Sequence, residues 1–128
     1  MVAEHLETGR KGEGLAQDFL RKKGYKIVAT NYRCPFGEID LIAQDKESMV
    51  FIEVKTRTNE DFGPPQLAVT ARKQKQLIKV ALNYLKRNHL HQQDCRFDIV
   101  AINLTQEGAK RIELIKNAFS LDQTKYFY

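Results

Sequence analysis

Two segments rich in strand-forming residues, 37–43 and 50–57, place the charged residues Asp40, Glu53 and Lys55 among apolar ones. Successive side chains along a strand point to opposite faces, so Glu53 and Lys55, two positions apart, share one face. A carboxylate or an ammonium group among apolar strand residues is costly unless it is paired or binds a ligand. A structural ion-pair network is the alternative, but an exposed pair contributes only about 0–1 kcal/mol. We therefore treat the three residues as a candidate site.

The chemistry that these residue types suit is metal-assisted hydrolysis of a phosphodiester. Such hydrolysis needs a water made nucleophilic near neutral pH and a neutralised phosphate charge, and Mg²⁺ supplies both. Mg²⁺ usually takes one or two protein carboxylates, so Asp40 and Glu53 suffice, with the Val54 carbonyl as a further ligand. Mn²⁺ is expected to substitute for it. Lys55 would orient or deprotonate the attacking water or stabilise the developing charge, and the sequence leaves these roles open.

Glu13 is a further candidate, but it lies in a different kind of segment. The surrounding residues have helical periodicity, with an apolar stripe formed by Leu15, Ala16, Phe19 and Leu20. Glu13 would reach the metal, directly or through a water, if this helix packs across the sheet. Spacing leaves equally open that it faces solvent and interacts with the helix dipole.

The elements that would position these residues alternate in the order α-β-β-β-α-β-β. One helical pattern runs from a cap at Thr8 to about Lys23, and another from a cap at Thr70 to about Asn88. Five segments have the composition of strands: residues 25–33, 38–44, 49–57, 95–104 and a short fifth at 111–116. We predict an α/β fold with a mixed sheet flanked by helices and the 49–57 strand central in it.

No repeat or linker divides the 128 residues, so we expect a single domain over residues 1–128 with its core at about 8–120. Residues 58–67 contain two adjacent prolines and predict a surface loop beside the site, and the aromatic tail 126–128 is expected to be flexible. Two cysteines without CxxC spacing indicate neither a zinc site nor a disulfide. Without a leader or a long apolar run, we expect a cytoplasmic protein with no membrane partner.

Basic residues suggest a polyanionic partner. Lysine and arginine outnumber aspartate and glutamate by 21 to 16, a net charge of +5. Several lie on the expected outer face of the 70–88 helix: Lys73, Lys75, Lys79 and Lys86. Such a face attracts nucleic acid, although lysines on solvated helices often serve solubility alone. Arg57, at the end of the strand that carries the site, would bind phosphate or be a simple strand-end cation.

Several motifs together resemble the PD-(D/E)XK nuclease superfamily: Glu13 in its helix, Gly37-Glu38-Ile39-Asp40 and Glu53-Val54-Lys55. The resemblance is closer to the bacterial YraN-type family of proposed nucleases, and it extends from about Gly9 to about Phe119. The further motifs that carry it are Gly12-Glu13, Gly24-Tyr25, Phe62-Gly63, Lys73-Gln74 and Arg96-Phe97-Asp98. These proteins are similar in fold to archaeal Holliday-junction resolvases.

The resemblance implies a restriction-endonuclease-like core and a role for each matching residue. Asp40 and Glu53 would bind the metal, Lys55 would be the catalytic lysine, and Glu13 would assist metal binding. Gln74 would be an accessory polar residue. Ile39 stands where the superfamily name expects proline, but the metal chemistry does not need that proline.

These expectations define a Mg²⁺-dependent endonuclease of DNA, including branched or junction DNA, for which a homodimer would match symmetric junctions. The basic helix, with Lys73, Gln74, Lys75 and Lys79, and Arg57 would hold the nucleic acid. The alternative is a non-catalytic nucleic-acid-binding module that acts with a partner protein. A third hypothesis is an interaction scaffold in which the site persists as an ion-pair network.

Overall fold

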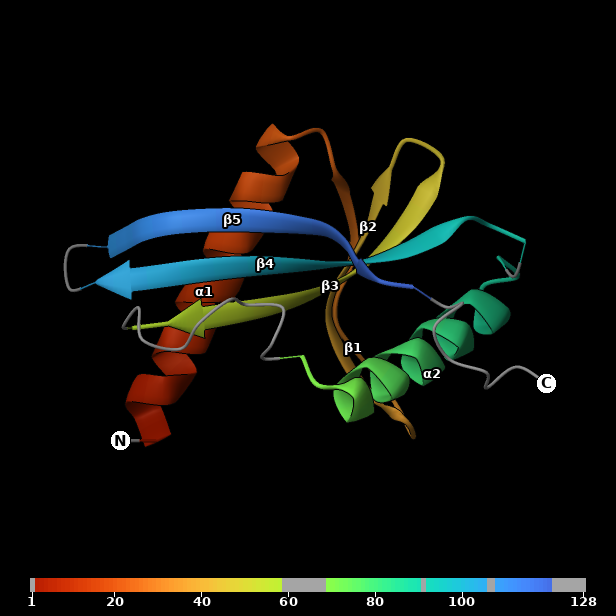
Figure 1. Cartoon of the computed structure of the whole chain (residues 1–128), viewed down its shortest axis with the longest axis horizontal. Coiled ribbons are helices and arrows are strands. Elements are labelled where there is room, and N and C mark those ends of the chain that lie inside the picture. The colour runs from red at the N-terminus through yellow and green to blue at the C-terminus, as the bar shows by residue number, and fades with distance from the viewer. Residues whose placement is uncertain (1, 59–68, 91, 106–107, 121–128) are drawn as a thin grey trace.

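The computed structural model describes residues 2–58, 69–90, 92–105 and 108–120, with side chains described for 11–58, 69–90, 92–104 and 111–120. Two helices and five strands follow one another in the predicted order (Figure 1). Their bounds are α1 Val2–Lys22, β1 Lys26–Cys34, β2 Gly37–Asp45, β3 Ser48–Arg57, α2 Ala71–Arg87, β4 Cys95–Thr105 and β5 Gly108–Phe119. The α/β class is confirmed.

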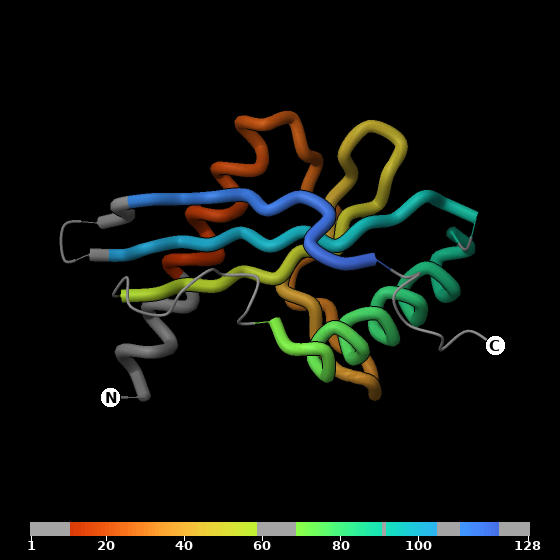
Figure 2. The backbone as a smooth tube through the Cα atoms, in the orientation of Figure 1, coloured from red at the N-terminus to blue at the C-terminus, as the bar shows by residue number. Residues whose placement is uncertain are grey.

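The strands form one mixed sheet in the order β1-β2-β3-β4-β5, with β3 at its centre as predicted. Neighbouring strands are antiparallel except β3 and β4, which run parallel. A parallel pair needs a long crossover, which here contains α2. The long strands β4 and β5 lie side by side (Figure 2).

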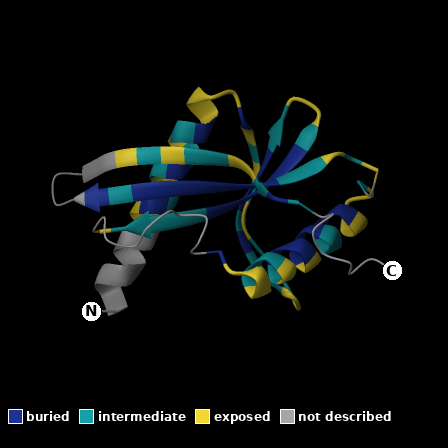
Figure 3. Ribbon diagram, in the orientation of Figure 1, coloured by how far each residue is buried: buried dark blue, intermediate teal, exposed yellow. Residues whose placement is uncertain are grey.

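Each face of the sheet is covered by one helix. Leu20 of α1 packs in a buried cluster with Ile52 of β3, whereas Ile78 of α2 packs in a second cluster with Phe51. Buried residues accordingly fill the central strands and the inner side of α2, whose outer side is exposed (Figure 3). Because strand side chains alternate, Glu53 lies on the same face as Phe51, the face that α2 covers.

Two element boundaries differ from the sequence prediction. α1 begins at Val2 and not at Thr8, since residues 2–7 include several good helix formers. β5 spans Gly108–Phe119 and is not short, because it pairs with β4 from Thr105↔Gly108 to Phe97↔Phe119. Charged residues on an edge strand are common, and they obscured this strand's apolar pattern.

The second helix begins as predicted. Thr70 Oγ1 accepts a hydrogen bond from the backbone N–H of Lys73 at 3.2 Å, the geometry of an N-cap. Most of the predicted 58–67 loop and all of the 126–128 tail lie outside the described residues. Within the part of the chain that the structure describes, neither helix has the length and apolar character that crossing a membrane requires.

Candidate active site

Strands β2 and β3 stop pairing where the candidate site begins. Their register ends at Leu41↔Ile52 and does not extend to Asp40. Instead, Asp40 Oδ2 accepts a hydrogen bond from the backbone N–H of Val54 at 2.8 Å. The N–H and C=O of one residue in an extended strand point to the same side, so the Val54 carbonyl faces the same gap. The Asp40 carboxylate and the Val54 carbonyl, which the sequence analysis named as candidate metal ligands, therefore border the same gap.

Glu53 is a nearly buried carboxylate between two lysines, with 7% of its side chain exposed. Its Oε2 lies 3.9 Å from Lys55 Nζ and 3.6 Å from Lys73 Nζ. The pKa of Glu53 is raised to about 8, chiefly by burial and then by a hydrogen bond with Asp40 and by the charge of Asp40, while the two lysines act in the opposite direction. The Asp40 and Glu53 side chains therefore lie next to each other.

Glu13 reaches the same cluster from α1. Its pKa is raised by burial and then by the charge of Asp40, while a hydrogen bond with the Asn31 side chain lowers it. Asn31 has a left-handed φ of 50°, which asparagine adopts more readily than most residues. Glu13 therefore lies near enough to Asp40 for their charges to interact, although among the described residues Glu13, Asp40 and Glu53 do not form a three-carboxylate metal site.

Two contacts of the site were not predicted from the sequence, because Lys73 was expected only to bind nucleic acid and Asn31 was given no role. Placing Lys73 on the solvent side of its helix is wrong, because its side chain is only 36% exposed and its ammonium faces Glu53. The signal was the cap at Thr70, which puts Lys73 in the first turn after a strand-to-helix crossover, where α/β proteins commonly form sites. Nothing in the sequence distinguishes Asn31 from other polar residues of a strand.

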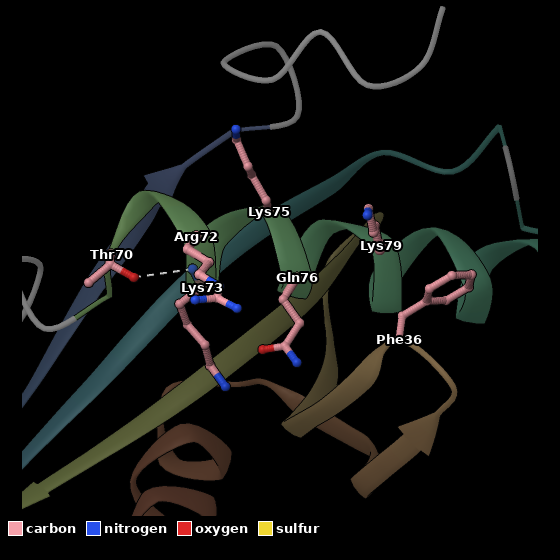
Figure 4. Close-up of a pocket in the computed structure, with 7 residues that line it drawn as sticks. All are labelled: Phe36, Thr70, Arg72, Lys73, Lys75, Gln76 and Lys79. Atoms are coloured by element: carbon pink, nitrogen blue, oxygen red, sulfur yellow. Dashed lines mark hydrogen bonds between the residues drawn. The ribbon is translucent and has the colours of Figure 1, made fainter.

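A pocket of about 440 Å³ opens between α2 and the β1–β2 turn, and Lys73, whose Nζ lies 3.6 Å from Glu53, is part of its lining (Figure 4). Its lining residues are Phe36, Thr70, Arg72, Lys73, Lys75, Gln76 and Lys79, which include three of the predicted nucleic-acid-binding lysines. Gln74 is not among them, since its amide donates to the Val69 carbonyl at 3.1 Å. Arg57, the last residue of β3, is also outside this lining.

The donor set fits a hydrated cation better than an enclosed one. Among residues with described side chains, no three histidine, cysteine or carboxylate groups are arranged to hold a metal. Mg²⁺ usually keeps several waters and takes one or two protein carboxylates. Asp40, Glu53 and the Val54 carbonyl make such a set. The charge of Asp40 contributes to the raised pKa of Glu53, and a bound cation would offset that repulsion.

Comparison with known proteins places the chain in a family. The family model described as "Uncharacterised protein family UPF0102" matches residues 12–102. UPF0102 proteins of Pelobacter propionicus, Syntrophus aciditrophicus and Geobacter metallireducens are 49%, 48% and 47% identical to this chain. The alignments cover 92%, 94% and 94% of this chain and 86%, 94% and 98% of the relatives. The chain therefore belongs to the UPF0102 family, the YraN family that its motifs predicted.

Proposed function

We propose that this protein is a metal-dependent endonuclease that hydrolyses phosphodiester bonds in DNA. The observation that carries the proposal is the meeting of two carboxylates, Asp40 and Glu53, with two lysines at a cation-lined pocket. Lys73 joins the two parts, because it lines the pocket and lies 3.6 Å from Glu53. Carboxylates suit the metal and ammonium groups suit a phosphate, so both requirements of the reaction are met in one place.

Each residue has a role that follows from its position. Mg²⁺ or Mn²⁺, when bound, would supply an activated water and polarise the scissile phosphate. Asp40 is oriented for metal binding by the Val54 N–H, and Glu53 completes the carboxylate pair. Lys55 is 31% exposed, so its ammonium is open to a water or a phosphate oxygen while it stays beside Glu53. It would hold the attacking water or stabilise the developing charge.

Cleavage of labelled four-way junction, flap, single-stranded and duplex DNA, with Mg²⁺ and then Mn²⁺, tests the proposal. We expect Asp40→Asn and Glu53→Gln each to lower the rate by about a hundredfold or more, the usual scale for removing a group that acts in the transition state. Glu113→Gln is the matched control, since Glu113 is an exposed carboxylate on β5. Equal cleavage by all preparations would identify a contaminating nuclease and overturn the proposal.

Metal and DNA binding separate the remaining hypotheses. Calorimetry should detect Mg²⁺ or Mn²⁺ binding to the wild type and a loss of it in Asp40→Asn. DNA binding with no cleavage under either metal would replace the nuclease by a non-catalytic module that acts with a partner. Absence of both metal and DNA binding would favour the scaffold hypothesis. A preference for symmetric four-way junctions would further imply two copies of the site, and hence a homodimer.

A further inference from the structure

Phe36 is an exposed aromatic residue in a pocket otherwise lined by polar and cationic side chains. It is 51% exposed, and only Val28, at 43%, is a comparably exposed large apolar residue among the described side chains. Single exposed apolar residues are common, so exposure alone would carry no argument. The neighbours of Phe36 give its exposure a meaning, because the seven residues that line the pocket include four cations and no carboxylate.

The β1–β2 turn that carries Phe36 lies close to α2. Gly37, the next residue, has a φ of 142°, and a Cβ added there would lie 2.6 Å from Gln76 Nε2. Only glycine allows the turn to approach Gln76 this closely. At the same end of the hairpin, Arg33 and Glu38 form an ion pair of 3.2 Å. An aromatic ring and an amide are therefore held on the same pocket (Figure 4).

The pocket adjoins the proposed catalytic residues through Lys73. This side chain lines the pocket, and its Nζ lies 3.6 Å from Glu53 Oε2. Figure 4 shows Lys73 and Gln76 extending to one side of α2 while Lys75 extends to the other. A phosphate held by Lys73 at the scissile position would thus place a neighbouring nucleotide in the pocket.

We infer that this pocket holds one unstacked nucleotide of the substrate, with its base on the Phe36 ring and its phosphate beside Arg72 and Lys73. The inference rests on the proposed function and narrows it. Bases of a continuous duplex cover one another, so a protein ring can stack only on a base that has left the helix. Aromatic platforms combined with cations are how proteins bind single strands without reading their sequence. The substrate is therefore DNA with an unpaired nucleotide next to the scissile phosphate.

Binding without divalent metal tests the pocket separately from catalysis. Fluorescence anisotropy would compare a single-stranded oligonucleotide, a flap, a plain duplex and a strand of abasic nucleotides of equal length. We expect Phe36→Leu to weaken binding of the single strand and the flap about tenfold, within the range for loss of one base–aromatic stack. Duplex and abasic strands should bind both proteins equally, and Phe36→Tyr should retain tight binding. Val28→Ala, at the other exposed apolar residue, is the matched control.

The outcomes distinguish this inference from the nuclease proposal. Equal losses for normal and abasic strands, or for single strand and duplex, would overturn the stacked nucleotide. Cleavage of plain duplex by the wild type as fast as cleavage of the flap would also overturn it, while the nuclease proposal stands. Binding that depends on Phe36, without cleavage under Mg²⁺ or Mn²⁺, would support the pocket and reject the nuclease.

Discussion

At the level of a single residue, Glu53 shows that a buried carboxylate of the candidate site makes the stability of the fold depend on pH. Its pKa is raised from 4.5 to about 8 by burial and then by Asp40, so the folded protein favours the protonated form. Below pH 4.5 the folded and unfolded chains both hold this proton. Between pH 4.5 and about 8 only the folded chain holds it, so the free energy of unfolding falls across that window as pH rises.

We expect Glu53→Gln to remove this fall. Relative to pH 4.5, the variant should gain on the order of 1 kcal/mol or more over the wild type at pH 8, since one pKa unit corresponds to about 1.4 kcal/mol. Urea denaturation of both proteins at several pH values measures the difference between their free energies of unfolding. The titration of other groups affects both proteins equally and cancels in this difference. Parallel curves for the two proteins across the window would contradict the assignment.

A second prediction at the level of a single residue concerns Lys73. Its ammonium lowers the pKa of Glu53, so Lys73→Gln should make that carboxylate ionise at higher pH. In the proposed enzyme, cleavage near pH 7 should fall about tenfold or more, and the rate should recover partly as pH rises. Lys86→Gln, in the exposed last turn of the same helix, is the control. An unchanged pH–rate profile in Lys73→Gln would place Lys73 outside the catalytic group.

Sequence reasoning found Asp40, Glu53 and Lys55 because a charged residue in an apolar strand is locally anomalous. It assigned Lys73 only to nucleic-acid binding and did not connect it with Glu53, because a lysine on an amphipathic helix is locally ordinary. Only the crossover between two parallel strands brings this helix turn to Glu53. The site residues that could be predicted were therefore those whose charge is unusual for the apolar strand around them.

At the level of elements, α1 can carry Glu13 to the sheet because Gly12 contacts β3. A Cβ added at Gly12 would lie 2.1 Å from Thr56 Oγ1 and 3.2 Å from Thr56 Cβ, whereas one added at Gly14 meets nothing within 4 Å. Gly12→Ala should therefore push α1 outward and cost about 1–3 kcal/mol of stability. Gly14→Ala should stabilise the helix by up to about 1 kcal/mol.

Thermal or urea unfolding of the two glycine variants measures these effects, with cleavage assays reporting the displacement of Glu13. Thr56→Ala combined with Gly12→Ala should recover part of the stability, since it removes the atom in closest contact. Equal stabilities for Gly12→Ala and Gly14→Ala would show that the helix does not depend on this contact.

A polar network centred on Asp98 joins β4 to Tyr25, just before β1, and to β5. Asp98 is 1% exposed and accepts hydrogen bonds from the Tyr25 hydroxyl at 3.1 Å, from Arg96 Nε at 3.0 Å and from the Asn117 N–H at 2.9 Å. Asp98→Ala should cost about 3 kcal/mol or more because buried donors lose their acceptor. Tyr25→Phe should cost only about 1 kcal/mol, measured in the same urea titration. Similar costs for both would show that Asp98 is not the centre of the network.

This network also shows that motif resemblance does not distinguish structural residues from residues of the candidate site. Tyr25 and Asp98 belong to the motifs that identified the family, as do Asp40 and Glu53. In the structure the first two hold strands together, and the last two form the candidate site. Element order and the central strand were predictable from periodicity and composition, whereas the length of the charged edge strand β5 became visible only from its pairing with β4.

At the level of the whole molecule, the net charge of +5 would attract DNA to the protein in general. The pocket that Lys73 shares with Arg72 and Lys79 would instead bind the DNA at one place. Each phosphate contact releases bound counterions, so it adds about 0.7 to the slope of log K against log salt for single strands.

We expect Arg72→Gln and Lys79→Gln each to reduce that slope by about 0.7 for single-stranded DNA, while Lys86→Gln leaves it unchanged. Anisotropy titrations over a range of salt concentrations measure the slopes. All three variants change the net charge of +5 by one unit, so a general field would lower the three slopes equally. Equal slopes for the three variants would thus show that binding is spread over the whole surface. Slopes lowered only by the two pocket substitutions would show that the nucleic acid binds at the pocket that Lys73 lines next to Glu53.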